Sequence, residues 1–144
     1  MMTPVKLGIV GLGTVGCGTL SILKDNAELI TARAGRPVMV TMAAVRDLSR
    51  ARSCDTTGIQ LTDDPLQVAT SDVDVVLELM GGTGKALEVV RTAIESGKHV
   101  ITANKALLAE HGNELLALAE AKGVMVAFES SVAGGIPVIK AIKE

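Results

Sequence analysis

Aromatic side chains are almost absent from this sequence, which has one Phe and no Tyr or Trp among its 144 residues. Proteins that bind single-stranded nucleic acid stack the bases on aromatic rings, so a stacking surface of that kind is excluded. An excess of positive charge is also missing, since 14 Lys and Arg stand against 16 Asp and Glu, for a net charge of −2. Both absences argue against a nucleic-acid partner.

Cysteine is scarce, because Cys17 and Cys54 are the only two in the sequence. Two cysteines are too few for the disulfide framework of a small secreted protein. No motif flanks either of them, so we interpret each as a small buried or half-buried residue and not as a catalytic thiol.

The longest uncharged run, residues 7–23, follows Lys6 and contains five glycines. It is therefore not the clean apolar stretch of a membrane span, and it lacks the small-residue cleavage site of a signal peptide. The sequence predicts no membrane association and a cytoplasmic location.

Hydrophobic residues make up 48% of the chain, and the mean hydropathy of +0.42 excludes a disordered protein. Apolar runs with strand and helix periodicity alternate along the chain. The expected strands are Val5–Val10, Val38–Val45, Ile59–Leu61, Asp74–Leu79, His99–Thr102 and Val124–Glu129. The expected helices are Thr14–Ala32, a helical turn over Ser49–Cys54, a short helix near Pro65, Lys85–Ser96 and Lys105–Lys122.

Strands that alternate with helices require crossover connections, which pair the strands in parallel. The pattern predicts an α/β fold of the Rossmann-like, doubly wound type, with a mostly parallel sheet and helices on both faces. We expect residues 1–136 to form this domain. Residues 137–144 begin a new helix after Pro137, which predicts the start of a connection to a further domain.

A glycine motif, Gly-x-Gly-x-x-Gly, follows the first expected strand at Gly11, Gly13 and Gly16. Gly11 permits a tight turn out of the strand, Gly13 lets a diphosphate approach the backbone, and Gly16 lets the helix pack closely on the strand. The amides at the helix start then face the anion. Between a buried strand and a long helix, this motif predicts dinucleotide binding; a glycine turn kept for packing is the alternative.

The end of the second strand carries Arg46 and Asp47, where dinucleotide-binding domains recognise the adenosine ribose. The Arg46 guanidinium matches the geometry of the 2′-phosphate of NADP. Asp47 is suited to an unphosphorylated ribose, or to capping the residues that follow it. The residues favour NADP and leave NAD open.

Three further loops follow strands. Glu78–Gly82 and Thr102–Lys105 come at carboxyl ends of expected strands, where ligands of open α/β sheets bind. Lys105 is placed to reach that crevice; the alternatives are a plain turn and a surface lysine. The small-residue loop Glu129–Pro137 exposes carbonyls that suit a hard cation, although a helix-entry turn is the default interpretation.

Taken in order, the segments GLGTVG, VRD, TANKALLA and ESSVAGGIP resemble homoserine dehydrogenase. The resemblance covers nearly the whole chain, but only the amino-terminal, nucleotide-binding part of that enzyme. Members of the family interconvert aspartate 4-semialdehyde and L-homoserine with NADPH or NADH, on the route to threonine and methionine. The resemblance therefore implies an oxidoreductase with a small-molecule substrate.

The resemblance also implies roles for individual residues. The diphosphate would be held by Gly11, Gly13, Thr14, Val15 and Gly16. Arg46 matches the family position facing the ribose 2′-phosphate, and Lys105 matches a lysine near the nicotinamide. A monovalent cation, expected to be Na⁺, would be bound through Glu129, Val132, Gly134 and Ile136.

The family's catalytic lysine and substrate-binding acids belong to a following domain, so the resemblance assigns no catalytic residue within these 144 residues. We expect this part to bind NADP(H) without turnover, and the whole parent enzyme to form a homo-oligomer. Two alternatives stay open from the sequence. One is another amino-acid dehydrogenase, such as aspartate dehydrogenase, and the other is a nucleotide-sensing module without catalysis.

Overall fold

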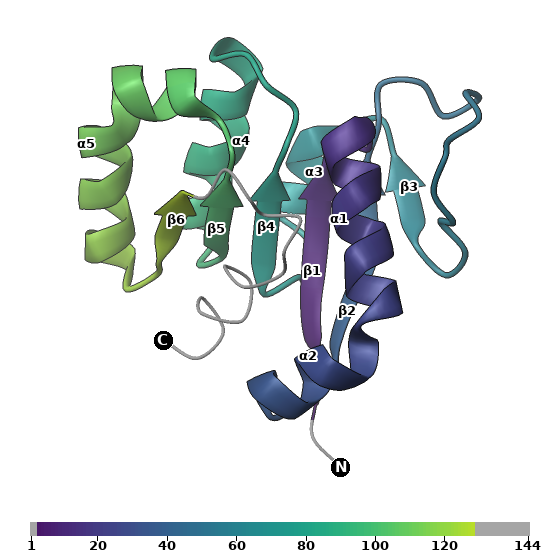
Figure 1. The fold of residues 1–144 in the computed structure, drawn as a ribbon. Coiled ribbons are helices and arrows are strands. Elements are labelled where there is room, and N and C mark those ends of the chain that lie inside the picture. Colours follow the sequence, from purple (N-terminus) through teal and green to yellow (C-terminus); the bar gives the residue numbers. More distant parts are fainter. Residues whose placement is uncertain (1–2, 129–144) are drawn as a thin grey trace.

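The computed structural model describes residues 3–128 (Figure 1). Within this range, the strands are β1 (Val5–Val10), β2 (Val38–Ala44), β3 (Gln60–Thr62), β4 (Val75–Glu78), β5 (His99–Thr102) and β6 (Val126–Phe128). The helices are α1 (Thr14–Asp25), α2 (Ala27–Ala34), α3 (Pro65–Ala69), α4 (Gly84–Glu95) and α5 (Lys105–Lys122).

The strands form one sheet in the order β3-β2-β1-β4-β5-β6, and every neighbouring pair is parallel. This is the order of a doubly wound dinucleotide-binding fold, in which the chain reverses its direction of travel across the sheet between β1 and β4. The predicted fold class is thereby confirmed. The carboxyl ends of β1 and β4 lie side by side at the reversal, because Val10 pairs with Glu78.

Helices cover both faces of the sheet, as Figure 1 shows, and each face has its own apolar core. On one face, Leu20 and Leu23 of α1 pack with Leu7 and Ile9 of β1. On the other, α3, α4 and α5 pack over Val10 and Val76. Side chains alternate between the two faces along a strand, so one buried strand supplies both cores.

Two predicted elements are wrong. The expected helix Thr14–Ala32 is two helices, α1 and α2, which meet at Asn26. The Asn26 side chain donates a hydrogen bond to the carbonyl of Ile22 at 2.9 Å, and its φ of −113° and ψ of 23° lie outside the helical range. A short polar side chain that bonds the backbone in this way competes with helix continuation.

The expected helical turn at Ser49–Cys54 is likewise absent from the described residues, where this stretch forms turns without a helix. Asp47 and Ser49 bond to each other locally, as described below. The remaining strand and helix boundaries agree with the predicted ones exactly or within about two residues. No helix in residues 3–128 combines the length and apolarity needed to cross a bilayer.

Candidate functional site

A cavity of about 810 Å³ lies at the carboxyl ends of β1, β2 and β4. Its position at the reversal of strand order is where open α/β sheets bind their ligands. The wall comes from the glycine turn and the first helix (Val10–Thr14, Cys17, Gly18, Ser21), from the end of β2 and its loop (Ala44–Asp47, Arg50–Ser53), and from Asp63, Pro65, Leu79 and Met80.

Two glycines of the motif have no room for a side chain, Gly11 in the turn after β1 and Gly16 in the first turn of α1. Gly11 has a φ of +103°, and a β-carbon there would lie 3.0 Å from the backbone of Leu79. A β-carbon on Gly16 would lie 2.0 Å from the carbonyl oxygen of Gly11. The start of α1 therefore rests directly on the turn, which is the close packing predicted from the third glycine of the motif.

The amino end of α1 opens onto the cavity through Gly13 and Thr14. The first hydrogen bond of the helix runs from the Cys17 amide to the Gly13 carbonyl at 2.9 Å. The backbone amides before Cys17, at the start of α1, therefore have no partner within the helix. The first turn of α1 contains no acidic residue. Free amides together with the positive end of the helix dipole suit a phosphate anion.

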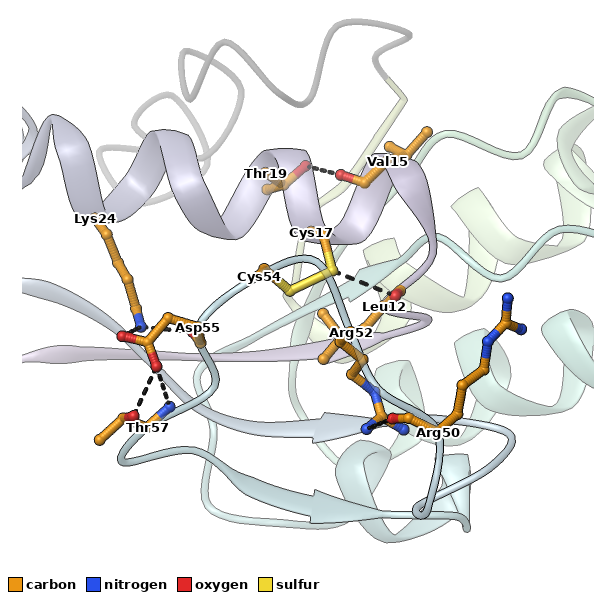
Figure 2. Close-up of a disulfide and its surroundings, with 10 residues drawn as sticks. All are labelled: Leu12, Val15, Cys17, Thr19, Lys24, Arg50, Arg52, Cys54, Asp55 and Thr57. Carbon is orange, nitrogen blue, oxygen red and sulfur yellow. Dashed lines mark hydrogen bonds and ion pairs between the residues drawn. A yellow bond between two sulfur atoms is a disulfide. The ribbon is translucent and has the colours of Figure 1, made fainter.

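The loop after β2 brings positive charge to the same cavity through Arg46, Arg50 and Arg52. Arg46 and Arg50 are exposed, whereas Arg52 is folded onto its own loop. As Figure 2 shows, the Arg52 guanidinium lies against the backbone of Arg50, to whose carbonyl it donates at 2.8 Å. It also donates to the carbonyl of Asp47. Arg52 thus shapes the loop, and Arg46 and Arg50 are available to a ligand.

Asp47 is engaged by its own loop. Its Oδ1 accepts hydrogen bonds from the Ser49 hydroxyl at 2.6 Å and from the Ser49 amide at 2.9 Å. The Ser49 hydroxyl, followed by the amide, lowers the pKa of the Asp47 carboxyl below its usual value. Asp47 thus closes a local turn with Ser49 and caps no helix, because this stretch forms none.

A disulfide between Cys17 and Cys54 ties α1 to the loop that carries the arginines (Figure 2). Cys17 is 5% exposed and Cys54 is partly buried against the same core. Both residues are buried to the expected degree, but their pairing does not follow from the sequence. The bond joins Cys17, which lines the cavity, to Cys54, which directly follows the wall residue Ser53 and lies 37 positions further along the chain.

The cavity wall contains four of the predicted nucleotide-binding residues: Gly11, Gly13, Thr14 and Arg46. It does not contain the other three. Val15 is 51% exposed, Gly16 lies beneath the turn, and Lys105 is an exposed residue that begins α5. The predicted cation ligands Glu129, Val132, Gly134 and Ile136 lie outside the described residues.

The sequence did not single out Arg50, Arg52 or Cys17, which line the cavity, or Cys54, which is bonded to Cys17. The signal for the arginines was their number, since three of them fall within seven residues after the second strand. Nothing in the sequence signalled the cysteines, because their proximity depends on how the loop folds back over α1.

A protein-family model described as the NAD-binding domain of homoserine dehydrogenase matches residues 11–129. A homoserine dehydrogenase of Pseudomonas aeruginosa is 57% identical over 99% of this chain and 33% of its own length. That of Bacillus subtilis is 40% identical over the same shares. The chain thus spans about a third of the length of the curated relatives it matches.

Solved structures agree with these relatives. A homoserine dehydrogenase from Thiobacillus denitrificans superposes with a TM-score of 0.85 at 54% identity, over 99% of this chain and 33% of that one. One from S. aureus gives a TM-score of 0.83 at 37% identity, over 90% and 33%. Aspartate dehydrogenase and a free-standing sensor module are not favoured. With its glycine turn, doubly wound sheet and crevice suited to a nicotinamide nucleotide, the chain belongs to the homoserine dehydrogenase family and corresponds to its NAD-binding domain.

Proposed function

We propose that this chain is the nucleotide-binding part of an enzyme that interconverts aspartate 4-semialdehyde and L-homoserine, with NADP(H) as the cofactor. One observation carries the proposal. The glycine turn, the free amino end of α1 and two exposed arginines share a single cavity at the reversal of strand order. That combination suits a nucleotide with a diphosphate and a further phosphate on the adenosine side.

The proposed preference for NADP over NAD rests on Arg46. Arg46 is exposed on the wall at the end of β2, where adenosine ribose is recognised in this fold. Because a guanidinium pairs with phosphate through parallel hydrogen bonds, Arg46 favours the 2′-phosphorylated nucleotide. The neighbouring Asp47 accepts from Ser49 through Oδ1 only, so its carboxylate does not distinguish the two nucleotides.

The residues of this chain would bind and orient the nucleotide, whose nicotinamide supplies or accepts the hydride when bound. The α1 amides near Gly13 and Thr14 would hold the diphosphate, and Arg46 the 2′-phosphate. We assign no general acid among residues 3–128. We propose that the acid and the homoserine-binding groups lie in the two thirds of the relatives' length that this chain does not match.

A chimera tests the proposed activity. The matching third of the Pseudomonas aeruginosa relative is replaced by this chain, which is 57% identical to it. We expect homoserine-dependent reduction of NADP, measured as absorbance at the nicotinamide band. The 144-residue chain alone should bind NADPH saturably but show no turnover. A folded chimera without activity, together with no NADPH binding by the chain, would contradict the proposal.

Arg46→Ala tests the cofactor preference. Loss of a hydrogen-bonded charge pair costs about 1.5–3 kcal/mol, so NADPH affinity should fall roughly 10- to 100-fold. NADH affinity should change by less than about twofold, since NADH has no phosphate at that position. Isothermal titration with both nucleotides measures the difference. Arg33→Ala, an exposed arginine in the last turn of α2, is the matched control. Equal losses for NADPH and NADH would exclude phosphate recognition by Arg46.

Several predictions rest on the resemblance or on composition alone and stay predictions. They are the Na⁺ site at Glu129, Val132, Gly134 and Ile136, the contact of Lys105 with the nucleotide near its nicotinamide, the domain boundary near residue 136, homo-oligomer formation by the parent, and a cytoplasmic location.

A further inference from the structure

Glu78, the last residue of β4, is a fully buried carboxyl group that the proposed nucleotide contacts do not use. A carboxylate is costly to bury unless hydrogen bonds replace its water. Both oxygens of Glu78 are engaged. Oε1 accepts from the Thr102 hydroxyl at 2.8 Å, and Oε2 accepts from the Met80 amide at 3.0 Å. The carboxylate thus joins the end of β5 to the loop after β4.

The network continues through Asn104. Its backbone amide donates to the Thr102 hydroxyl oxygen at 3.0 Å, so that hydroxyl both donates and accepts. The Asn104 side-chain oxygen caps α5 by accepting from the Leu107 amide at 3.0 Å. Its side-chain nitrogen donates to the carbonyl of Gly82. One connected set of hydrogen bonds therefore holds the loop after β4 against the start of α5.

The first half of this loop is also held in other ways, since the Leu79 amide donates to the Val10 carbonyl at 2.9 Å and Leu79 and Met80 pack on the two cores. The two glycines that follow are less restrained. Gly81 and Gly82 both have positive φ, +76° and +74°, and β-carbons built on them meet no atom within 4 Å. Packing therefore does not restrain the two glycines on that side. Glycine has the largest backbone freedom of any residue, so the hydrogen bonds at either side of the glycines, from Met80 to Glu78 and from Asn104 to Gly82, restrain this part of the loop.

The loop forms the side of the cavity opposite the arginines. Leu79 and Met80 line the wall, and Glu78 pairs in register with Thr102 of β5 and with Val10 of β1. In a doubly wound fold, the half of the sheet that begins at β4 serves the second mononucleotide of a dinucleotide. The network therefore lies beneath the nicotinamide half of the site and away from the adenosine half.

We infer that Glu78 is a positioning residue: through Thr102 and Asn104 it holds the Leu79–Gly82 loop in the place that binds the nicotinamide half of NADP(H). This rests on the proposed function. The Glu78 carboxylate touches neither substrate nor cofactor in this assignment. It accepts hydrogen bonds from a hydroxyl and a backbone amide, and these fix a loop whose backbone faces the ligand.

Two probes separate the halves of the site. NADPH occupies both halves, whereas 2′,5′-ADP carries the adenosine and 2′-phosphate groups and lacks nicotinamide. In Glu78→Gln, the side-chain oxygen can still accept from the Met80 amide, but the side-chain nitrogen then meets the Thr102 hydroxyl, which must accept where it now donates and so loses its own acceptor. We expect NADPH affinity of the 144-residue chain to fall about tenfold, with 2′,5′-ADP affinity changed by less than twofold. Isothermal titration measures both.

Three variants at two other positions keep the test independent of folding. Asn104→Asp retains the helix cap but loses the donor to Gly82, so it should reproduce the selective loss. Thr102→Val keeps the shape and removes the hydroxyl, whereas Thr102→Ser keeps the hydroxyl and removes a methyl group. NADPH affinity should fall in the valine variant and be retained in the serine variant, whatever their relative melting temperatures.

The outcomes are distinguishable. Selective loss of NADPH affinity in Glu78→Gln and Asn104→Asp, with rescue by serine at position 102, supports the inference. Equal losses for NADPH and 2′,5′-ADP, or no loss for either, overturn it and leave the proposed function standing. Absence of saturable NADPH binding in the unsubstituted chain contradicts the proposed function itself.

Discussion

Replacing Gly16 with alanine is expected to destabilise the protein by about 3 kcal/mol or more and to remove most NADPH binding. The added β-carbon would lie 2.0 Å from the Gly11 carbonyl oxygen and 3.0 Å from the Gly11 carbonyl carbon. Both are backbone atoms, and Gly11 is itself constrained by its positive φ and by the Leu79 backbone. The start of α1 must therefore move away from β1, and the amides of that turn move with it.

Chemical denaturation and thermal unfolding measure the first effect, and a fall of roughly 10 °C in melting temperature is expected for a domain of this size. Gly18→Ala is the matched control for stability. A β-carbon at Gly18 meets no atom within 4 Å, and alanine in a helix interior is favoured over glycine by roughly 0.5–1 kcal/mol. The two substitutions in one helix should thus change stability in opposite directions.

Gly13→Ala separates binding from folding. Its β-carbon also meets no atom within 4 Å, and its φ of −79° is accessible to alanine, so stability should change little. The methyl group would occupy the approach of the diphosphate, and NADPH affinity should fall.

Equal stability of the Gly16→Ala and Gly18→Ala variants would contradict the first prediction, because it would show that the close contact between the turn and α1 is relieved at little cost.

Reduction of the Cys17–Cys54 disulfide is expected to lower the free energy of unfolding by about 3–4 kcal/mol, from the entropy of closing a 37-residue loop in the unfolded chain. Denaturant titrations with and without a reductant measure this difference. Thiol titration of the unreduced, unfolded protein should detect no free thiol, and two after reduction. Cytosolic proteins rarely keep disulfides, and the sequence predicts a cytoplasmic location, so the stability of the reduced form is the one expected to apply there.

The loop from residue 45 to 59 should also respond locally to reduction. After reduction, the loop keeps the hydrogen bonds that the Arg52 guanidinium donates to backbone carbonyls. It also keeps the hydrogen bond from the Lys24 ammonium to the Asp55 carbonyl at 2.7 Å, but it loses its covalent tie to α1. Trypsin cleavage after Arg46, Arg50 or Arg52 should become faster. In Cys54→Ser, reductant should have no further effect on stability or cleavage. Two titratable thiols in the unreduced protein would contradict the pairing.

Local pattern determined the fold of this protein to a large extent. The alternation of apolar strands and helices predicted a parallel sheet with helices on both faces, and the glycine motif marked the strand end where the cavity lies. These features are readable because strand and helix periodicity, and the need for glycine at a tight turn, act over a few residues. The break at Asn26 was missed because a helix-compatible apolar pattern continues across it.

Tertiary structure alone decided which charged and polar groups meet. The disulfide joins Cys17 to Cys54, 37 positions apart in the chain. The hydrogen bond to the buried Glu78 comes from Thr102, 24 positions away. Such contacts depend on strand order and on the path of a loop, which periodicity does not encode. The same is true of Asp47, whose carboxylate closes a turn with Ser49 where the sequence suggested the cap of a helical turn.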